Sequence, residues 1–166
     1  MQEEKEGKVF IETTLAGPCV KDGWYAALLE CQTSKGPATR WLVGMEEKTT
    51  YHRSVLLAAI YALKRLKPCR VIIHTRCTYI IGNYQQDRPE GWSRSEWKKP
   101  TGEEVKNKDL WQQFLDEVNR LGGKGKITFQ FSKHHDYKDF LRKKIQEGQE
   151  ELKKKAEKEA EKQKKR

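Results

Sequence analysis

The stretch between residues 91 and 99 combines cations with tryptophans, two kinds of side chain that can bind a nucleic-acid backbone. Its members are Trp92, Arg94, Trp97, Lys98 and Lys99. Cations set against phosphates give affinity without choice of sequence, and rigid aromatic rings can pack on sugars or bases. Two interpretations are open, because the tryptophans could instead pack this stretch internally while its cations are only solvated.

A second candidate for phosphate binding lies at the predicted start of a helix. Thr50, His52 and Arg53 could offer backbone N–H groups or side chains to a phosphate there. Thr50 could equally serve only as the helix cap.

No other catalytic arrangement is visible in the sequence. There is no glycine-rich phosphate loop and no hydrolase triad. The four cysteines, Cys19, Cys31, Cys69 and Cys77, form no Cys-x-x-Cys motif and no paired metal spacing. This predicts free, mostly buried thiols in a reducing cytoplasm, with Cys77 an unreactive one.

No apolar run approaches the length of a membrane span, so no membrane association is expected.

A helix followed by a buried strand organises the middle of the chain. Apolar residues recur at three- and four-residue steps between a cap at Thr49 or Thr50 and a stop at Pro68, which predicts an amphipathic helix. The unbroken apolar run at 71–73 predicts a strand buried on both faces. A helix leading into such a strand indicates an α/β sheet that is mostly parallel.

Further elements are predicted on both sides of this unit. Hydrophobic patterning and turn signals predict three strands before it, and a second helix and a last strand after it. The stretch between Gly82 and Gly102 mixes turn formers, bases and aromatics without clear periodicity. The predicted strands are 8–12, 24–32, 38–45, 71–73 and 127–131, and the second helix is 108–121.

The chain is basic, with a net charge of +10 from 34 Lys and Arg against 24 Asp and Glu, and such an excess attracts polyanions. From Leu141 to Arg166 there are 11 basic and 6 acidic residues, so half of the excess lies at the end. Composition favours a solvated helix there over a coiled coil, because heptads are absent. We therefore expect a disordered N-terminus over 1–7, one domain over 8–142, and a charged helical or disordered tail over 143–166.

Three ordered segments resemble ribonuclease H of the bacterial type I class. They are Thr-Thr-x-x-Arg-x-x-Leu-x-Ala-Ala-Ile-x-Ala-Leu at 49–63, Val-Ile-Ile-His-Thr-x-x-x-Tyr at 71–79, and Val-Lys-Asn-Lys-Asp-Leu-Trp at 105–111. The resemblance extends from about residue 8 to about residue 142. It implies a ribonuclease H-like α/β fold, with a five-stranded mixed sheet flanked by helices and followed here by the charged tail. It also implies that the tryptophan-bearing basic stretch is the protrusion that follows the nucleic-acid backbone.

The resemblance also implies a metal site that this chain has partly lost. The family holds two divalent cations with four carboxylates, which hard cations of this kind require. The first carboxylate position falls on Glu12, the second on Val55 and the third on Arg76, while the fourth falls on Asp139 or Asp136. Since valine cannot bind a metal and arginine repels one, no cofactor is expected unless magnesium or manganese binds a weakened site.

Two positions of Arg76 are open. The guanidinium could lie against Glu12 and against Asp136 or Asp139, neutralising them as a magnesium ion would. Alternatively, Arg76 could extend into solvent. The pair His134-His135 resembles the family's mobile histidine, although exposed loop histidines without a catalytic role are common.

These observations predict a degenerate ribonuclease H, a pseudo-enzyme that binds an RNA–DNA hybrid or double-stranded RNA without cutting it. One alternative is a weak metal-dependent nuclease that cleaves the RNA of such hybrids, using Glu12 and an aspartate near 136–139. Another is a protein-interaction module whose charged tail binds a protein partner. A cytoplasmic monomer is expected in each case.

Overall fold

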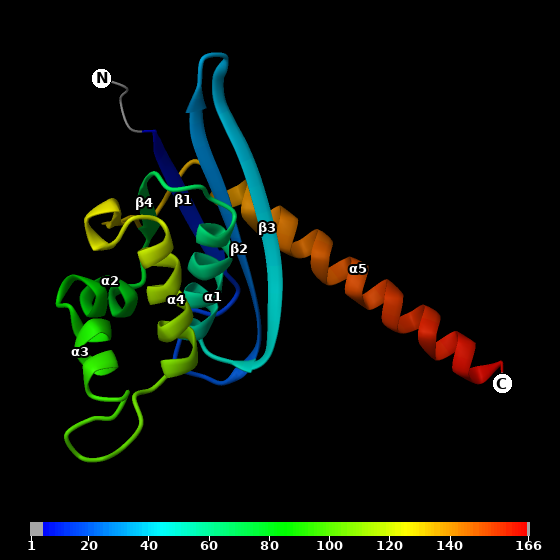
Figure 1. The fold of residues 1–166 in the computed structure, drawn as a ribbon. Coiled ribbons are helices and arrows are strands. Elements are labelled where there is room, and N and C mark those ends of the chain that lie inside the picture. The colour runs from blue at the N-terminus through cyan, green and yellow to red at the C-terminus, as the bar shows by residue number, and fades with distance from the viewer. Residues whose placement is uncertain (1–4, 166) are drawn as a thin grey trace.

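A five-stranded mixed sheet forms the centre of the computed structural model, which describes residues 5–165 (Figure 1). The strand order is β3-β2-β1-β4-β5. The pairs β1–β2 and β2–β3 are antiparallel, whereas β1–β4 and β4–β5 are parallel, which confirms the predicted fold class. The strands are β1 (Glu6–Thr13), β2 (Lys21–Thr33), β3 (Gly36–Thr49), β4 (Arg70–Thr75) and β5 (Ile127–Phe131).

Helices cover both faces of this sheet. The main core lies between the sheet, α1 and α4, and a smaller core lies under the first half of α5 on the opposite face. A short 3-10 turn at Lys124–Lys126 precedes β5. The helices are α1 (Tyr51–Lys64), α2 (Thr78–Gln85), α3 (Arg88–Arg94), α4 (Lys108–Arg120) and α5 (Lys138–Lys164).

The two central strands supply both cores because successive side chains of a strand point to opposite faces. On one face, Phe10, Ala26 and Leu28 pack with Leu141 and Ile145 of α5. On the other face, the alternate residues belong to the main core: Val9, Ile11, Ala27 and Leu29. These strands are therefore apolar on both sides.

Helix α1 lies where the sequence predicted it. Its cap is Thr50, whose hydroxyl accepts a hydrogen bond from the backbone N–H of Arg53, and the helix ends before Pro68. Every residue from Ser54 to Ile60 is buried, because α1 lies between the sheet and α4. This double covering explains why its apolar surface is wider than the stripe of an ordinary surface helix.

Two parts of the chain are more regular than predicted, and several strands extend beyond their predicted ends. Glu6 and Gly7 belong to β1 although a disordered terminus was predicted over 1–7; residues 1–4 lie outside the described residues. The stretch after Thr78 is also more regular than its sequence indicated, because it forms α2 and α3. Both helices are short and have little periodicity of their own.

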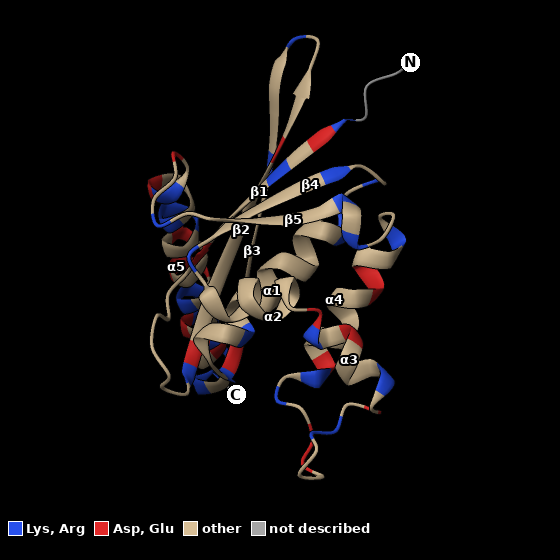
Figure 2. Ribbon diagram, turned by 90° about the vertical axis from the view of Figure 1, so that its left-hand side faces the viewer, with Lys and Arg blue, Asp and Glu red and all other residues tan. Residues whose placement is uncertain are grey.

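The last helix begins on the sheet and ends in solvent. Helix α5 buries Leu141 and Ile145, and all its described residues from Gln149 to Lys164 are exposed. Figure 1 shows this second half projecting beyond the sheet, and Figure 2 shows acidic and basic positions interspersed along the helix. Within the described residues, no helix has both the length and the apolar character needed to span a membrane.

Candidate nucleic-acid interface

A small pocket lies where β1 and β4 end. These strands are parallel and pair Phe10 with His74, so Glu12 and Arg76, each two residues further on, reach the same end of the sheet. The pocket thus joins three of the four positions at which the sequence predicted a degenerate metal site. Its lining residues are Ile11, Glu12, Thr13, Tyr51, Val55, Thr75, Arg76, Ser132 and Lys133.

Both carboxylate oxygens of Glu12 already have partners. One oxygen lies 3.1 Å from Nε2 of His135, and the other lies 3.7 Å from Nε of Arg142. The backbone N–H of Tyr137 donates to Nδ1 of His135, which therefore carries no proton there. The proton of a neutral His135 is consequently on Nε2, from which it is donated to Glu12.

The predicted contact between Arg76 and the remnant carboxylates is wrong. Arg76 is exposed, and within residues 5–165 no ion pair joins it to Glu12, Asp136 or Asp139. Its guanidinium instead lies 5.8 Å from the centre of the Tyr51 ring. The physical reason is that His135 and Arg142 already satisfy the carboxylate, so Arg76 gains little by giving up hydration to reach it.

Asp139 is not part of this pocket. It lies exposed in the first turn of α5, and the described residues give it no side-chain hydrogen bond or ion pair. The residues that contact Glu12 are His135, from the loop after β5, and Arg142, one turn further along α5. Sequence reasoning considered the histidine only as a mobile group and missed Arg142.

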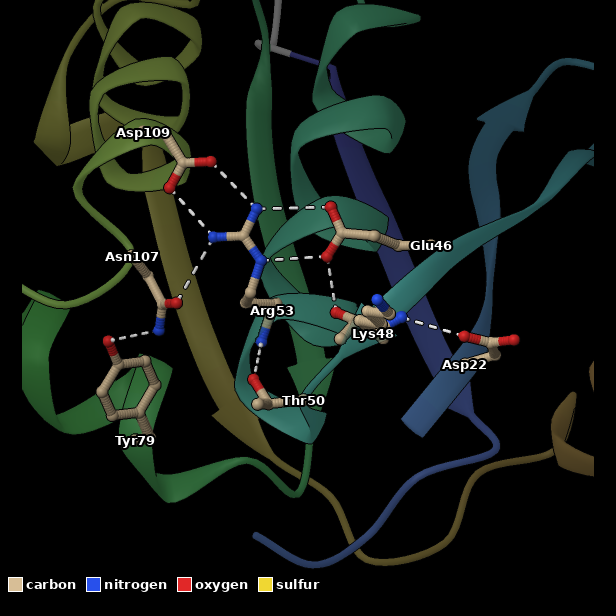
Figure 3. Close-up of polar contacts among 9 residues, drawn as sticks. Asp22, Glu46, Lys48, Thr50, Arg53, Tyr79, Asn107 and Asp109 are labelled. Carbon is tan, nitrogen blue, oxygen red and sulfur yellow. Dashed lines mark hydrogen bonds and ion pairs between the residues drawn. The ribbon is translucent and has the colours of Figure 1, made fainter. Parts of the chain in front are cut away.

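At the start of α1, the candidate phosphate ligand Arg53 is held by two carboxylates (Figure 3). Its Nε lies 2.9 Å from Glu46, and its two terminal nitrogens each lie 2.9 Å from an oxygen of Asp109. These hydrogen bonds lower the pKa of both carboxyl groups. The arrangement favours a structural role for Arg53 and the cap role for Thr50.

The tryptophans of the basic stretch pack inward. Trp92 and Trp97 are partly buried against the main core, and the Trp92 ring lies 5.8 Å from that of Trp111 in an edge-on arrangement. The neighbouring cations remain exposed: Arg94, Lys98 and Lys99. The structure therefore combines internally packed aromatic rings with a cationic surface on α3 and the loop that follows it.

A family model described as RNase H matches residues 17–161. The chain belongs to the ribonuclease H family. It is 32% identical over 133 residues to the ribonuclease H of Chlorobium luteolum, covering 80% of this chain and 85% of the relative. It is 33% identical over 137 residues to that of Acetivibrio thermocellus, covering 82% and 87% of the two chains.

Solved structures show the same ribonuclease H fold. The crystal structure of LC9-RNase H1, a type 1 RNase H with the type 2 active-site motif, matches with a TM-score of 0.67 and 20% identity, over 86% of this chain and 71% of that one. A foamy viral protease-reverse transcriptase in complex with an RNA/DNA hybrid matches with a TM-score of 0.58 and 10% identity, over 78% of this chain and 17% of that one.

The residues of this ribonuclease H-family pocket do not fit two divalent cations. Val55 is 1% exposed and offers no donor atom, while Arg76 brings a positive charge. Glu12 is already bound by His135 and Arg142. Across residues 5–165, no three His, Cys, Asp or Glu side chains are grouped so that they could hold a metal ion.

Proposed function

We propose that this protein binds an RNA–DNA hybrid or structured RNA without cleaving it. The observation that carries the proposal is the composition of the pocket at the ends of β1 and β4. Among the described residues that line it, Glu12 is the single carboxylate, and it lies beside buried Val55 and the cation Arg76. Hydrolysis with two metal ions needs several carboxylate oxygens to hold the pair, and these are lacking.

The cationic surface on α3 and the loop after it supports binding. Arg94, Lys98 and Lys99 are exposed, and none of them forms an ion pair with a described carboxylate. The net charge of +10 attracts a polyanion over a longer range. The foamy viral structure with a similar fold contains an RNA/DNA hybrid, which fits this choice of ligand.

A labelled hybrid duplex tests binding and cleavage in the same samples. We expect a mobility shift that weakens with salt and is unchanged by EDTA, because cations of the protein rather than bound metals contact the phosphates. Micromolar protein with magnesium or manganese should leave the RNA strand intact. Metal-dependent cleavage that disappears in the Glu12→Gln variant would instead establish the nuclease alternative.

The basic surface is tested by replacing its three cations together. The variant with Arg94, Lys98 and Lys99 all changed to Ala should bind the hybrid at least tenfold more weakly, because several phosphate contacts are lost. If its affinity equals that of the unchanged protein, α3 and its loop are not the contact surface.

A further inference from the structure

We infer that the mouth of the pocket at the ends of β1 and β4 binds a backbone phosphodiester directly, with Arg76 and Lys133 supplying the positive charge. This inference rests on the proposed binding function and names the group that the pocket takes. A phosphodiester carries one negative charge and exposed oxygens, which arginine and lysine recognise by charge-assisted hydrogen bonds.

The charge balance of the pocket supports this inference. Arg76 and Lys133 both line it and are exposed, and within residues 5–165 neither forms an ion pair with a carboxylate. Glu12 is the only acidic residue in the described lining, and its oxygens are held by His135 and Arg142. The pocket therefore presents two cations whose charges are not neutralised by any described carboxylate.

The sheet positions these two cations. β4 and β5 are parallel and pair Thr75 with Phe131, and the backbone N–H of Ser132 extends the pairing by donating to the carbonyl of Thr75 over 3.0 Å. Arg76 and Lys133 follow directly, so they leave the ends of neighbouring strands. A phosphate at the mouth of the pocket can be reached from both.

The aromatic ring of Tyr51 helps to hold the arginine at the pocket. Its centre lies 5.8 Å from the Arg76 guanidinium, within the range of a cation–π interaction. An arginine restrained in this way loses less side-chain freedom when it binds an anion. Buried Val55 also lines the pocket, and its side chain has no oxygen or nitrogen that could compete for the arginine.

The experiment compares hybrid binding, in EDTA, by the full-length protein and by the Arg76→Ala/Lys133→Ala double variant. We expect the double variant to bind about tenfold or more weakly, because a hydrogen bond to a charged group is lost. The dependence of its affinity on salt should also become shallower, by about one released counterion per contact removed. Thermal unfolding should be unchanged, since both side chains are exposed.

A matched control is available at the other end of the sheet. Lys35 lies exposed in the turn between β2 and β3. This turn is at the opposite end of the sheet from the pocket, because β1 pairs with the adjoining end of β2 through Gly7, whereas Glu12 pairs with the other end. Lys35→Ala removes one positive charge far from the pocket, half of what the double variant removes. It should leave affinity nearly unchanged, and a loss equal to that of the double variant would overturn the inference in favour of a general charge effect.

Hybrids in which single phosphates are made uncharged show which phosphate Arg76 and Lys133 contact. Replacing single phosphodiesters of the hybrid by methylphosphonates should weaken binding to the unchanged protein at several positions, and at one of them the penalty should vanish in the double variant. Equal penalties in both proteins would overturn the inference while leaving hybrid binding intact. If the unchanged protein binds no hybrid at all, the proposed function fails together with the inference.

Discussion

At the scale of single residues, Arg53 shows how a side chain suited to phosphate can be used inside the protein. Its guanidinium is shared between Glu46, near the end of β3, and Asp109, in the first turn of α4. The pair with Asp109 uses two parallel hydrogen bonds, the stronger geometry for arginine and a carboxylate. Arg53 thereby connects β3, α1 and α4.

Replacing Arg53 with Met should lower the free energy of unfolding by about 1–2 kcal/mol, because two carboxylates lose their partner at a partly exposed site. Urea denaturation measures this change. Arg40→Met is the control, since Arg40 is exposed on β3. A similar loss in both variants would show that the ion pairs add nothing.

The same residues predict a dependence of stability on pH. Hydrogen bonds from Arg53 lower the pKa of Asp109 and of Glu46 in the folded state. As the pH falls, the unfolded chain therefore takes up these protons before the folded protein does. The stabilisation of the folded state by the two ionised carboxylates is complete above about pH 4.5, and it is lost as the pH falls through their pKa values in the folded protein. The Arg53→Met variant should lose less stability over that acid range than the unchanged protein. Parallel curves for the two proteins would contradict this.

Residues at the pocket also predict how metal binding could be introduced. Val55→Glu together with Arg76→Asp adds two carboxylates beside Glu12 and removes the repelling cation. We expect this double variant to bind Mn²⁺ measurably by calorimetry, whereas the unchanged protein should not. Val55→Glu alone keeps Arg76 and serves as the control. Tight Mn²⁺ binding by the unchanged protein would refute our interpretation of the pocket.

At the scale of elements, α5 is attached to the sheet by a few contacts in its first half. Leu141 and Ile145 are buried against β1 and β2. Gly148 lets the helix lie close to Trp24, because a Cβ at that position would lie 2.9 Å from the indole ring. A glycine inside a helix costs about 1 kcal/mol relative to alanine. The close approach explains why it is tolerated here.

Truncating a buried side chain and an exposed side chain of α5 should therefore have different effects. Leu141→Ala is expected to lower the free energy of unfolding by about 2–5 kcal/mol, since Leu141 is fully buried. Leu152→Ala is expected to change it by about 0.5 kcal/mol or less, because Leu152 is 46% exposed. Denaturant unfolding of the two variants checks this. Equal effects would mean that the two halves of α5 are equally attached.

At the scale of the whole molecule, part of the positive charge lies on a segment that contributes to neither hydrophobic core. The main core lies between the sheet, α1 and α4. The exposed end of α5 adds cations without adding to either core. This separation allows the contribution of the tail to nucleic-acid binding to be measured alone.

Ending the chain at Lys153 removes seven basic and three acidic residues, so the net charge falls from +10 to +6. Thermal stability should be unchanged, because the described residues removed are all exposed. Hybrid binding should weaken severalfold at low salt and converge with that of the full chain at high salt, where long-range attraction is screened. A loss that persists at high salt would instead indicate direct contacts by the tail.

Much of the fold was determined by local patterns in the sequence. The helix from Thr50 was predicted by its cap and apolar steps, and β4 and β5 by an apolar run and a clean alternation. The substitutions Val55 and Arg76 could also be interpreted from residue type, because no tertiary contact makes valine a metal ligand. The short helices α2 and α3 could not be predicted this way, since they depend on packing against α1 and α4.

Only the tertiary structure decided which charged groups are paired. Arg53 meets Asp109 across 56 positions of sequence, and His135 meets Glu12 across 123. No local pattern records such pairs, because they arise when α4 and the chain after β5 pack against the sheet. That packing gives the carboxylate of Glu12 its partners within the protein and leaves Arg76 and Lys133 facing solvent. Residue types alone could not decide between the two positions of Arg76, because the choice depends on these distant partners of Glu12.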